Sequence, residues 1–383
     1  ELAARDAERP VPTPSPAPAA KPAPKRAAKS APMGDAIPFG DAVKRLAKVV
    51  EKGCTAPVLS CALIEGFNGR AVLTGTDRAI RMMIFTDAPW PAGEARCVDI
   101  AALVKAKGIP SPAPGDRVTV GGATLLGLSP ADYPVFGAPP QLRNPERFAA
   151  SALHAALSAV EHAIAPDDNR HGLNGLHVEE EAGDARLVST DGNRLATTII
   201  PGVPWTLGKW LLPRKFVAAL LSALARRGDA EVNVATKDHW VAVESGPVRF
   251  LARMIEADFP DWRQFVPTAF GRTVACDREA LAGAFKRLLP FAPTDTVRIV
   301  VEGDRLVLTA RKLGAGEARE EVAARVEGEG ITLGVNAKYA LDALAARTDG
   351  GVVIRIGGTL APMIWRGREH AEPRWIVMPV RLD

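Results

Sequence analysis

Apolar side chains recur at helical spacing at three places along the chain, and strand-like segments follow each of them. The first pattern runs through Phe39 to Val50, and steps of three and four residues place its apolar side chains on one helix face. The other two patterns use Leu153, Leu157, Val160 and Ile164, and then Leu281, Phe285 and Leu288. Ser151 and Asp277 are the expected N-caps of these two helices.

Short runs with the alternation of strands follow each helix, and a second helix comes after them. The strand-like runs are "RAVLTGTD" (70–77), "ARLVSTDG" (185–192) and "RLVLTARK" (305–312). The second helices are expected at 98–108, 213–228 and 336–347, with further strands after each. The order strand, helix, strands, helix, strands therefore occurs three times, at roughly 115–125 residues per copy.

One aromatic phrase closes the first two copies. "EADFPDWRQFVP" spans Glu256–Pro267, and a reduced form, "PADYPVFGAPP", spans Pro130–Pro140. Linkers rich in Pro and Gly are expected at 137–146 and 266–273. We therefore predict an α+β fold of three repeated units, with antiparallel sheets and helices on one face. The expected divisions of the chain are a tail at 1–36 and units at 37–140, 141–268 and 269–383.

The start of the chain has a different composition from the rest. Residues 9–32, "RPVPTPSPAPAAKPAPKRAAKSAP", are rich in Pro and Ala and lack the apolar core of a signal peptide. We expect a disordered, partly polyproline tail there. The whole chain is 47% apolar and 24% charged, which suits ordinary globular cores, and its net charge of +4 is compatible with many partners.

Several classes of protein find no support in the sequence. No run of 18 apolar residues exists, so no membrane span is expected. The cysteines Cys54, Cys61, Cys97 and Cys276 form no C-x-x-C and no zinc spacing, so we expect reduced thiols in the cytoplasm, and no metal or cofactor. Nucleotide-binding and hydrolase motifs are missing from the sequence and the six histidines are scattered, so we expect no enzyme.

Lysine and arginine recur on the predicted helix faces that point away from the apolar positions. In the first helix, Lys44, Lys48 and Lys52 lie at i, i+4 and i+8, with Arg45 beside them. The further cations of this set are Lys105, Lys107, Arg214, Lys215, Arg226, Arg227, Lys286, Arg287, Lys338 and Arg347. On a single helix such cations suit a solvated face. Their recurrence in all three units favours a positive surface that binds phosphates without reading sequence.

Five segments, in order, carry a resemblance to a known family. They are "GLNGLHVE" (172–179), "VSTDGNRLATTIIP" (188–201), "LLPRK" (211–215), "DFPDWRQFVP" (258–267) and "IVMPVRL" (376–382). Together with the threefold repeat, they make the chain from about Phe39 onward resemble the bacterial beta sliding clamps, the processivity subunits of the replicative DNA polymerase.

The resemblance implies a DNA clamp fold with three similar domains per subunit. Two subunits would join head to tail into a homodimeric ring, with helices lining the hole and sheets outside. Such a ring holds duplex DNA by topology, so its contacts can be weak and independent of sequence. The implied partners are double-stranded DNA and the polymerase and clamp-loader subunits that dock short hydrophobic peptides. Of these cations, the ones expected to face the DNA, together with Arg170, are Lys44, Arg45, Lys48, Lys52, Lys105, Lys107, Arg214, Lys215, Lys286, Arg287 and Lys338.

The peptide site that the resemblance implies is a hydrophobic groove between the second and third domains. Matched by motif, its residues are Leu173, Thr190, Gly192, Arg194, Leu195, Pro260, Phe265, Val266, Ile376, Met378, Pro379, Val380 and Arg381. Leu, Met, Val and Pro form an apolar slot that suits a leucine or phenylalanine of a peptide, and methionine adapts to several partners. Taken alone, "TDGNR" favours a simple hairpin turn.

The sequence departs from the family pattern at several positions. Asn193 stands where histidine is frequent, Gln264 where arginine is common, and Phe265 is bulkier than the usual aliphatic residue. Gly53 and Asp167 fall on the side expected to face DNA, where they offer no positive charge. These departures leave a second interpretation open: a clamp-like replisome adaptor that binds partner peptides without encircling DNA.

Overall fold

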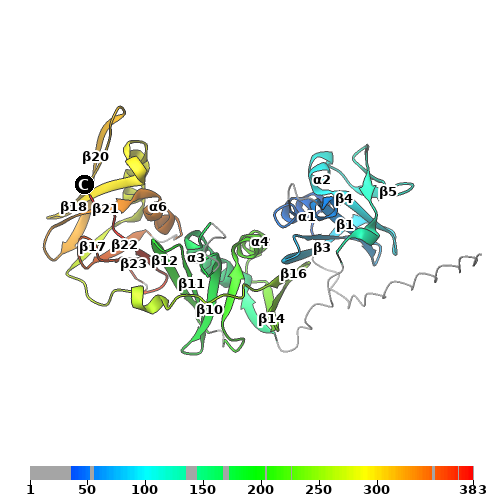
Figure 1. The fold of residues 1–383 in the computed structure, drawn as a ribbon, viewed down its shortest axis with the longest axis horizontal. Coiled ribbons are helices and arrows are strands. Elements are labelled where there is room, and N and C mark those ends of the chain that lie inside the picture. Colours follow the sequence, from blue (N-terminus) through cyan, green and yellow to red (C-terminus); the bar gives the residue numbers. More distant parts are fainter. Residues whose placement is uncertain are drawn as a thin grey trace, which may run out of the picture. The chain divides into compact units, whose positions relative to one another are not determined.

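The computed structural model describes residues 36–51, 56–134, 145–166, 172–202, 205–225, 227–346, 350–369 and 371–382. Within these ranges one order of helix, strands, helix and strands occurs three times (Figure 1). We call the three copies the first, second and third modules.

The first module contains two helices and eight strands in the described residues. Its elements are α1 (Phe39–Leu46), β1 (Cys61–Phe67), β2 (Arg70–Thr76), β3 (Ile80–Pro89), β4 (Ala95–Asp99), α2 (Ile100–Ala106), β5 (Pro110–Pro112), β6 (Val118–Val120), β7 (Ala123–Leu125) and β8 (Gly127–Leu128). Strands β5, β6 and β7 form a small antiparallel sheet of their own, with β7 at its edge.

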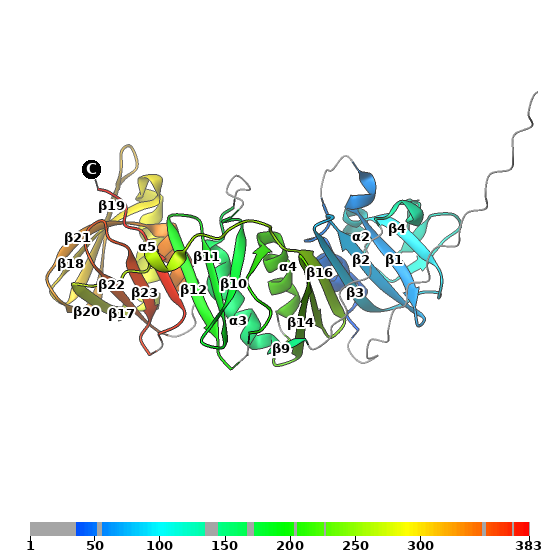
Figure 2. The ribbon, with the colours of Figure 1, turned by 60° about the horizontal axis from the view of Figure 1, so that its bottom comes forward.

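The second module repeats this plan, with longer strands after its second helix. Its elements are β9 (Glu146–Ala149), α3 (Ala150–Val160), β10 (Gly175–Glu181), β11 (Asp184–Thr190), β12 (Arg194–Ile200), β13 (Trp210–Pro213), α4 (Arg214–Leu224), β14 (Glu231–Lys237), β15 (Trp240–Ser245) and β16 (Val248–Arg253). Figure 2 shows β10, β11 and β12 side by side, and α3 and α4 pack on these strands.

The third module follows the same order. Its elements are β17 (Arg272–Asp277), α5 (Arg278–Leu288), β18 (Thr296–Glu302), β19 (Arg305–Lys312), β20 (Gly316–Glu327), β21 (Ile331–Asn336), α6 (Ala337–Ala345), β22 (Gly351–Ile356), β23 (Met363–Gly367) and β24 (Arg374–Val377). In all three modules the two helices pack against each other, and the first helix packs on the third long strand: α1 on β3, α3 on β12 and α5 on β20.

Antiparallel pairing across module boundaries joins the three copies into two large sheets. Strand β16 of the second module pairs with β3 of the first, so a nine-stranded sheet is shared between them. Strand β24 of the third module pairs with β12 of the second, within a twelve-stranded sheet. The fold is therefore α+β with antiparallel sheets, as the sequence predicts.

The apolar positions that predict the helices are buried. Leu46, Leu157, Leu281 and Phe285 are at most 2% exposed, and they pack against the sheets of their modules. Removing such side chains from water is the main favourable contribution to folding. Of the helices in the described ranges, none has both the length and the apolar character needed to cross a membrane.

The prediction for Asp277 is right and that for Ser151 is wrong. The Asp277 carboxylate accepts a hydrogen bond from the Ala280 amide at the start of α5. Helix α3 begins one residue before Ser151, and backbone carbonyls of Ala230 and Gly228 accept the amides of its first turn. Ser151 therefore lies inside the first turn and not at its N-cap position, and its hydroxyl donates to Asp229.

Several predicted helices are too long. Helix α1 ends at Leu46, so Lys48 lies in the turn that follows, where the Val49 and Val50 amides both donate to the Leu46 carbonyl. Helix α2 ends at Ala106, because Lys107 takes a left-handed backbone with a φ of 37°. Helix α4 ends at Leu224 and α6 at Ala345. Basic residues near helix ends therefore lie on turns as well as on helices.

Candidate functional site

An apolar cluster covers the join between the second and third modules on the sheet face opposite the helices. It contains Val188 of β11, Leu195 of β12, Ile376 of β24 and Ile364 of β23. Trp262 joins it from the connecting segment, residues 254–271, which links β16 to β17. Strand register explains the cluster, because Ile376 pairs with both Leu195 and Ile364 and so shares their face. Phe259, Val266 and Phe270 of the connecting segment pack on its edge.

The residues expected to line the peptide groove lie at different depths around this cluster. Leu195 and Ile376 are 4% and 2% exposed and form its floor. Phe265 and Met378 are 52% and 38% exposed, so they present apolar surface to solvent. Val266 is half-buried between these two levels. The structure thus brings part of the expected set together as a partly covered apolar surface.

The turn between β11 and β12 borders this surface. Gly192 has a φ of 90°, which favours glycine, and its amide donates to the Thr190 hydroxyl. The Asp191 carboxylate accepts the amides of Asn193 and Arg194. The Asn193 carbonyl accepts the Met378 amide, so this turn fixes the chain where it leaves β24.

The remaining expected groove residues lie along the connecting and C-terminal segments. Leu173, Pro260 and Pro379 are half-buried, and the Leu173 carbonyl accepts the Ala165 amide. The Val380 amide donates to Gly334 of β21, which holds the C-terminal segment against the third module. Arg381 is exposed.

Arg194 has a different environment from the other expected groove residues. Its guanidinium forms ion pairs with Asp191 and with Asp342 of α6, and it donates to the His162 carbonyl. The same group lies 4.4 Å from the centre of the Tyr339 ring, also on α6. Arg194 therefore joins the second module to a helix of the third, and its side chain is committed to that junction.

Sequence reasoning missed the charged residues that hold the connecting segment on the sheet. Glu179 of β10 is 4% exposed, and its carboxylate accepts the Trp262 indole N–H at 3.0 Å and pairs with Arg263 at 2.8 Å. His177, two residues earlier on the same face, stacks on Phe259 with ring centres 4.7 Å apart. The signal was the "HVEEE" run, whose alternation places His177 and Glu179 on one buried face.

These contacts set the ionisation of Glu179. Burial alone would raise the pKa of this carboxyl, but hydrogen bonds from Trp262, His177 and Arg263 outweigh it and lower the pKa to about 2. Burial also lowers the pKa of His177, so the imidazole is neutral at pH 7. The site is a structural anchor and offers no acid or base with a pKa near neutrality for catalysis.

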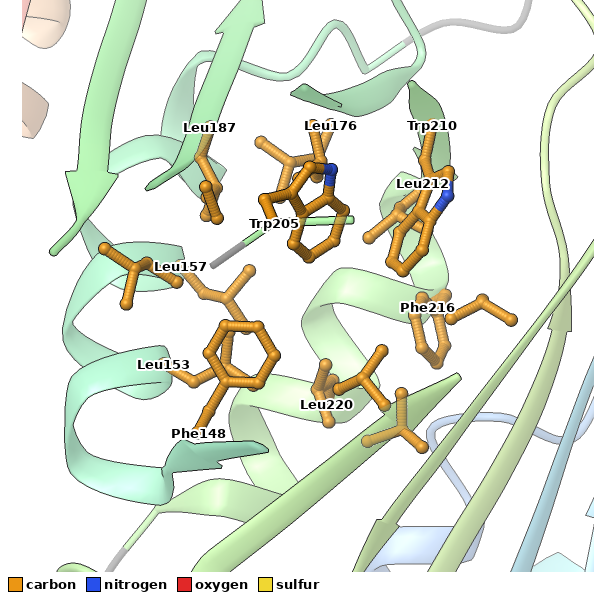
Figure 3. A pocket seen from close by; sticks show the side chains of 16 residues that line it. Phe148, Leu153, Leu157, Leu176, Leu187, Trp205, Trp210, Leu212, Phe216 and Leu220 are labelled. Carbon is orange, nitrogen blue, oxygen red and sulfur yellow. The ribbon is translucent and has the colours of Figure 1, made fainter. Parts of the chain in front are cut away.

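A small cavity lies elsewhere, inside the core of the second module. It has a volume of about 40 Å³ and an entirely apolar lining that includes Leu157, Leu176, Trp205 and Phe216. Figure 3 shows these side chains gathered around it, from α3, α4, β10 and the segment between β12 and β13. Because no polar group faces this small volume, it suits neither water nor a polar ligand, and we interpret the cavity as a packing defect.

The cations expected to face DNA are mostly exposed, but many have partners within the chain. Lys44, Lys215, Arg287 and Lys338 form ion pairs with Asp41, Asp77, Glu320 and Asp295, respectively. Arg45 donates to the Ala223 carbonyl and Lys48 to the Ser222 hydroxyl, which ties the end of α1 to α4. Lys105, Lys107 and Lys286 are exposed, and Arg214 is half-buried.

Some predictions fall outside the described residues. These are the tail at 1–35, Lys52, Gly53, Asp167, Arg170, Arg226 and Arg347. Within the described ranges, no group of three or more His, Cys, Asp or Glu side chains is arranged to hold a metal ion.

Comparisons with known proteins identify the family. The sequence matches the models of the DNA polymerase III beta subunit, with the central domain at residues 148–261 and the C-terminal domain at 263–381. It is 28% identical over 355 residues to the beta sliding clamp of Pseudomonas putida, covering 88% of this chain and 96% of that protein.

Solved structures show the same fold over nearly the whole chain. The beta subunit of Thermotoga maritima DNA polymerase III aligns with a TM-score of 0.81 at 22% identity, covering 90% of this chain and 97% of that one. The sliding clamp of Bartonella birtlesii bound to griselimycin aligns with a TM-score of 0.80 at 26% identity and the same coverage. Given the two domain matches, the full-length relatives and the shared fold, this chain belongs to the DNA polymerase III beta-subunit family, the sliding clamps that serve as non-catalytic processivity factors in DNA replication.

Proposed function

We propose that two copies of this chain join head to tail into a ring that encircles double-stranded DNA without reading its sequence. The ring tethers DNA polymerase and clamp-loader subunits, which dock short hydrophobic peptides on the apolar surface between the second and third modules. The ring acts in the cytoplasm, where bacterial DNA is replicated.

The ring is supported by a strand pairing that two modules make and the third lacks. Strand β3 of the first module pairs with β16, the last long strand of the second, and β12 pairs with β24 in the same way. By order along the chain, the third-module equivalent of β3 and β12 is β20. Over Gly316–Ala323 one edge of β20 pairs with β19, and no described strand pairs with its other edge.

The first module holds the strand that would supply this missing partner. The position of β16 and β24 after the second helix corresponds to β7 in the first module, and β7 lies at the edge of its small sheet. Leu126, directly after β7, is 75% exposed, as expected of an edge awaiting a partner. A second copy that places β7 beside β20 continues the pattern, and doing so twice closes a ring.

The mass of the full chain in solution tests this pairing. We expect a particle of twice 40.6 kDa, and we expect Leu126→Glu to shift it toward the single chain. Leu360→Glu is the matched control, because Leu360 is 52% exposed but lies in the turn between β22 and β23, away from both edges. A single-chain mass for the unmodified protein at micromolar concentration would contradict the ring.

Retention on DNA tests encirclement. After loading onto a nicked circular duplex, the ring should stay bound at moderate salt and be lost when the circle is linearised, because its hold is topological. Retention that does not depend on DNA ends would favour an open adaptor, which binds partners without surrounding the duplex.

The partner surface is tested with a ligand of a relative. Griselimycin is bound in the solved Bartonella birtlesii clamp, and we expect it to compete on this chain with a fluorescein-labelled peptide that carries Leu and Phe side chains. Replacing Leu173 and Met378 together by Glu should abolish binding of the peptide while the dimer mass stays unchanged. Normal peptide binding by this variant would place the partner surface elsewhere.

A further inference from the structure

A buried arginine lies between the two chain segments that carry the proposed partner surface. Arg186 of β11 has a side chain only 2% exposed, on the sheet face that carries the apolar cluster. Its guanidinium pairs with Glu181 at 2.6 Å and with Glu372 at 2.9 Å, and it also donates to the Thr197 hydroxyl. One planar group therefore bonds in two directions at once.

The first direction leads to the connecting segment. Glu181 accepts from Arg186 through one oxygen and from Arg263 at 2.8 Å through the other. Arg263 belongs to a short 3₁₀ turn, Trp262–Phe265, and this turn carries the exposed Phe265. The carboxylate of Glu181 thus relays the position of Arg186 to one part of the partner surface.

The second direction leads to the C-terminal strand. Glu372 accepts from Arg186 and also pairs with Arg374 at 2.6 Å, at the first residue of β24. Strand β24 supplies Ile376 to the apolar cluster, and the exposed Met378 follows it directly. The carboxylate of Glu372 thus relays the position of Arg186 to the other part of the partner surface.

The Trp262 ring contacts the guanidinium groups of both Arg186 and Arg263. The Arg263 guanidinium lies 4.6 Å from the centre of this ring, and the Arg186 guanidinium lies 5.8 Å from it. Both distances are within the range of cation–π attraction. Since the Trp262 N–H is fixed on Glu179, the ring cannot slide without breaking a buried hydrogen bond.

We propose that Arg186 is a positioning residue, which sets the separation between the connecting segment and the C-terminal strand and so preforms the surface that binds partner peptides. This inference rests on the function proposed above. This role explains why a charged side chain is buried here, although an apolar one would cost less to desolvate. Only the guanidinium can bond to Glu181 and Glu372 at once and so join both segments. A preformed surface spares the peptide the cost of ordering it.

The experiment uses the full chain and five variants, one of which is a control. Arg186→Met removes the fork, and the milder Arg186→Lys keeps the charge but supplies a single point donor. Arg263→Met and Glu372→Gln each break one direction only. Leu220→Ala, on α4 and beside the core cavity, is the control that lowers the stability of the same module without touching the ionic contacts.

Hydrogen exchange at 258–267 and 372–380 reports the two segments separately. Arg186→Met and Arg186→Lys should raise exchange in both, Arg263→Met only in the first and Glu372→Gln only in the second. Both Arg186 variants should weaken griselimycin binding by about tenfold, as expected when a site loosens by a fraction of an ångström. Leu220→Ala should bind griselimycin like the unmodified chain.

Unchanged griselimycin affinity in both Arg186 variants, or a rise in exchange confined to one segment, would overturn the proposal. Equal weakening by Leu220→Ala would overturn it too, because general destabilisation would then suffice. If the unmodified chain binds neither griselimycin nor the Leu/Phe peptide, the proposed function fails instead, and the paired exchange response still decides whether Arg186 joins the two segments.

Discussion

Replacing Glu179 by Gln tests the idea that a buried carboxylate charge anchors the connecting segment. The side chain is 5% exposed and keeps its size in the variant, so packing changes little. Folding lowers the pKa of this carboxyl from 4.5 to about 2. That difference corresponds to about 3 kcal/mol of stability at pH 7, since each pKa unit is worth about 1.4 kcal/mol.

The sign of the effect fixes its pH dependence. A depressed pKa means that folding favours the ionised form, so the contribution of Glu179 is complete above pH 4.5 and disappears as the pH falls toward 2. The difference in the free energy of unfolding between the unmodified chain and Glu179→Gln, which we call the stability gap, should therefore be widest at neutral pH and should shrink below pH 4.5.

Thermal melting followed by tryptophan fluorescence measures the stability gap. A loss of about 3 kcal/mol should lower the melting temperature of the second module by roughly 6–12 °C at pH 7. Glu256→Gln is the control, because that carboxylate lies in the same segment and pairs with Arg253 at the surface, where ion pairs contribute little. A stability gap of constant size between pH 7 and pH 3 would refute the reasoning, since the charge would then not be its source.

Further expectations concern DNA retention, helix capping and core packing. Lys105→Glu and Lys286→Glu together should shorten retention on circular DNA at moderate salt, with the dimer mass unchanged. These exposed residues are better probes than Arg45 and Lys48, because Arg45 and Lys48 also hold α1 to α4. Normal retention would mean that the faces of Lys105 and Lys286 do not meet the duplex. Asp277→Ala should lower the free energy of unfolding, measured by chemical denaturation, by about 1 kcal/mol, and Ser151→Ala should lower it less, because only Asp277 caps its helix. Equal losses in the two variants would argue against that assignment. Val243→Ile adds one methylene beside the cavity of about 40 Å³ and should raise the melting temperature by the equivalent of at most about 1 kcal/mol, whereas a lower melting temperature would mean that the void cannot accept it.

The repeat and the helix positions could be predicted because they depend on local spacing. Leu281, Phe285 and Leu288 read as one helix face, and that face is buried. Asp277 stands directly before its helix, so its capping role was visible in the sequence. Ser151 misled because α3 begins one residue before it, and the carbonyls that accept the first amides of this helix, those of Ala230 and Gly228, lie far along the chain.

The anchoring charges could not be predicted for the same reason. Glu179, Arg186, Arg263 and Glu372 are spread over almost 200 residues. Strand register places Glu179 opposite Arg186, and the connecting segment and the residues before β24 bring Arg263 and Glu372 to them. The pairing of Lys215 with Asp77 likewise depends on how two modules meet. The motif that marks Arg194 gave no sign that its guanidinium reaches α6, because Asp342 and Tyr339 are contributed by another module.

The pairing of β24 with β12 has a consequence for biosynthesis. Strand β12 emerges from the ribosome long before β24, so the sheet of the second module keeps an open edge while the whole third module is still being translated. The Trp375 indole, which donates to the Ala159 carbonyl of α3, arrives equally late. During that interval a nascent chain can pair with another nascent chain through this edge, so we expect chaperones to protect the chain in the period before β24 appears.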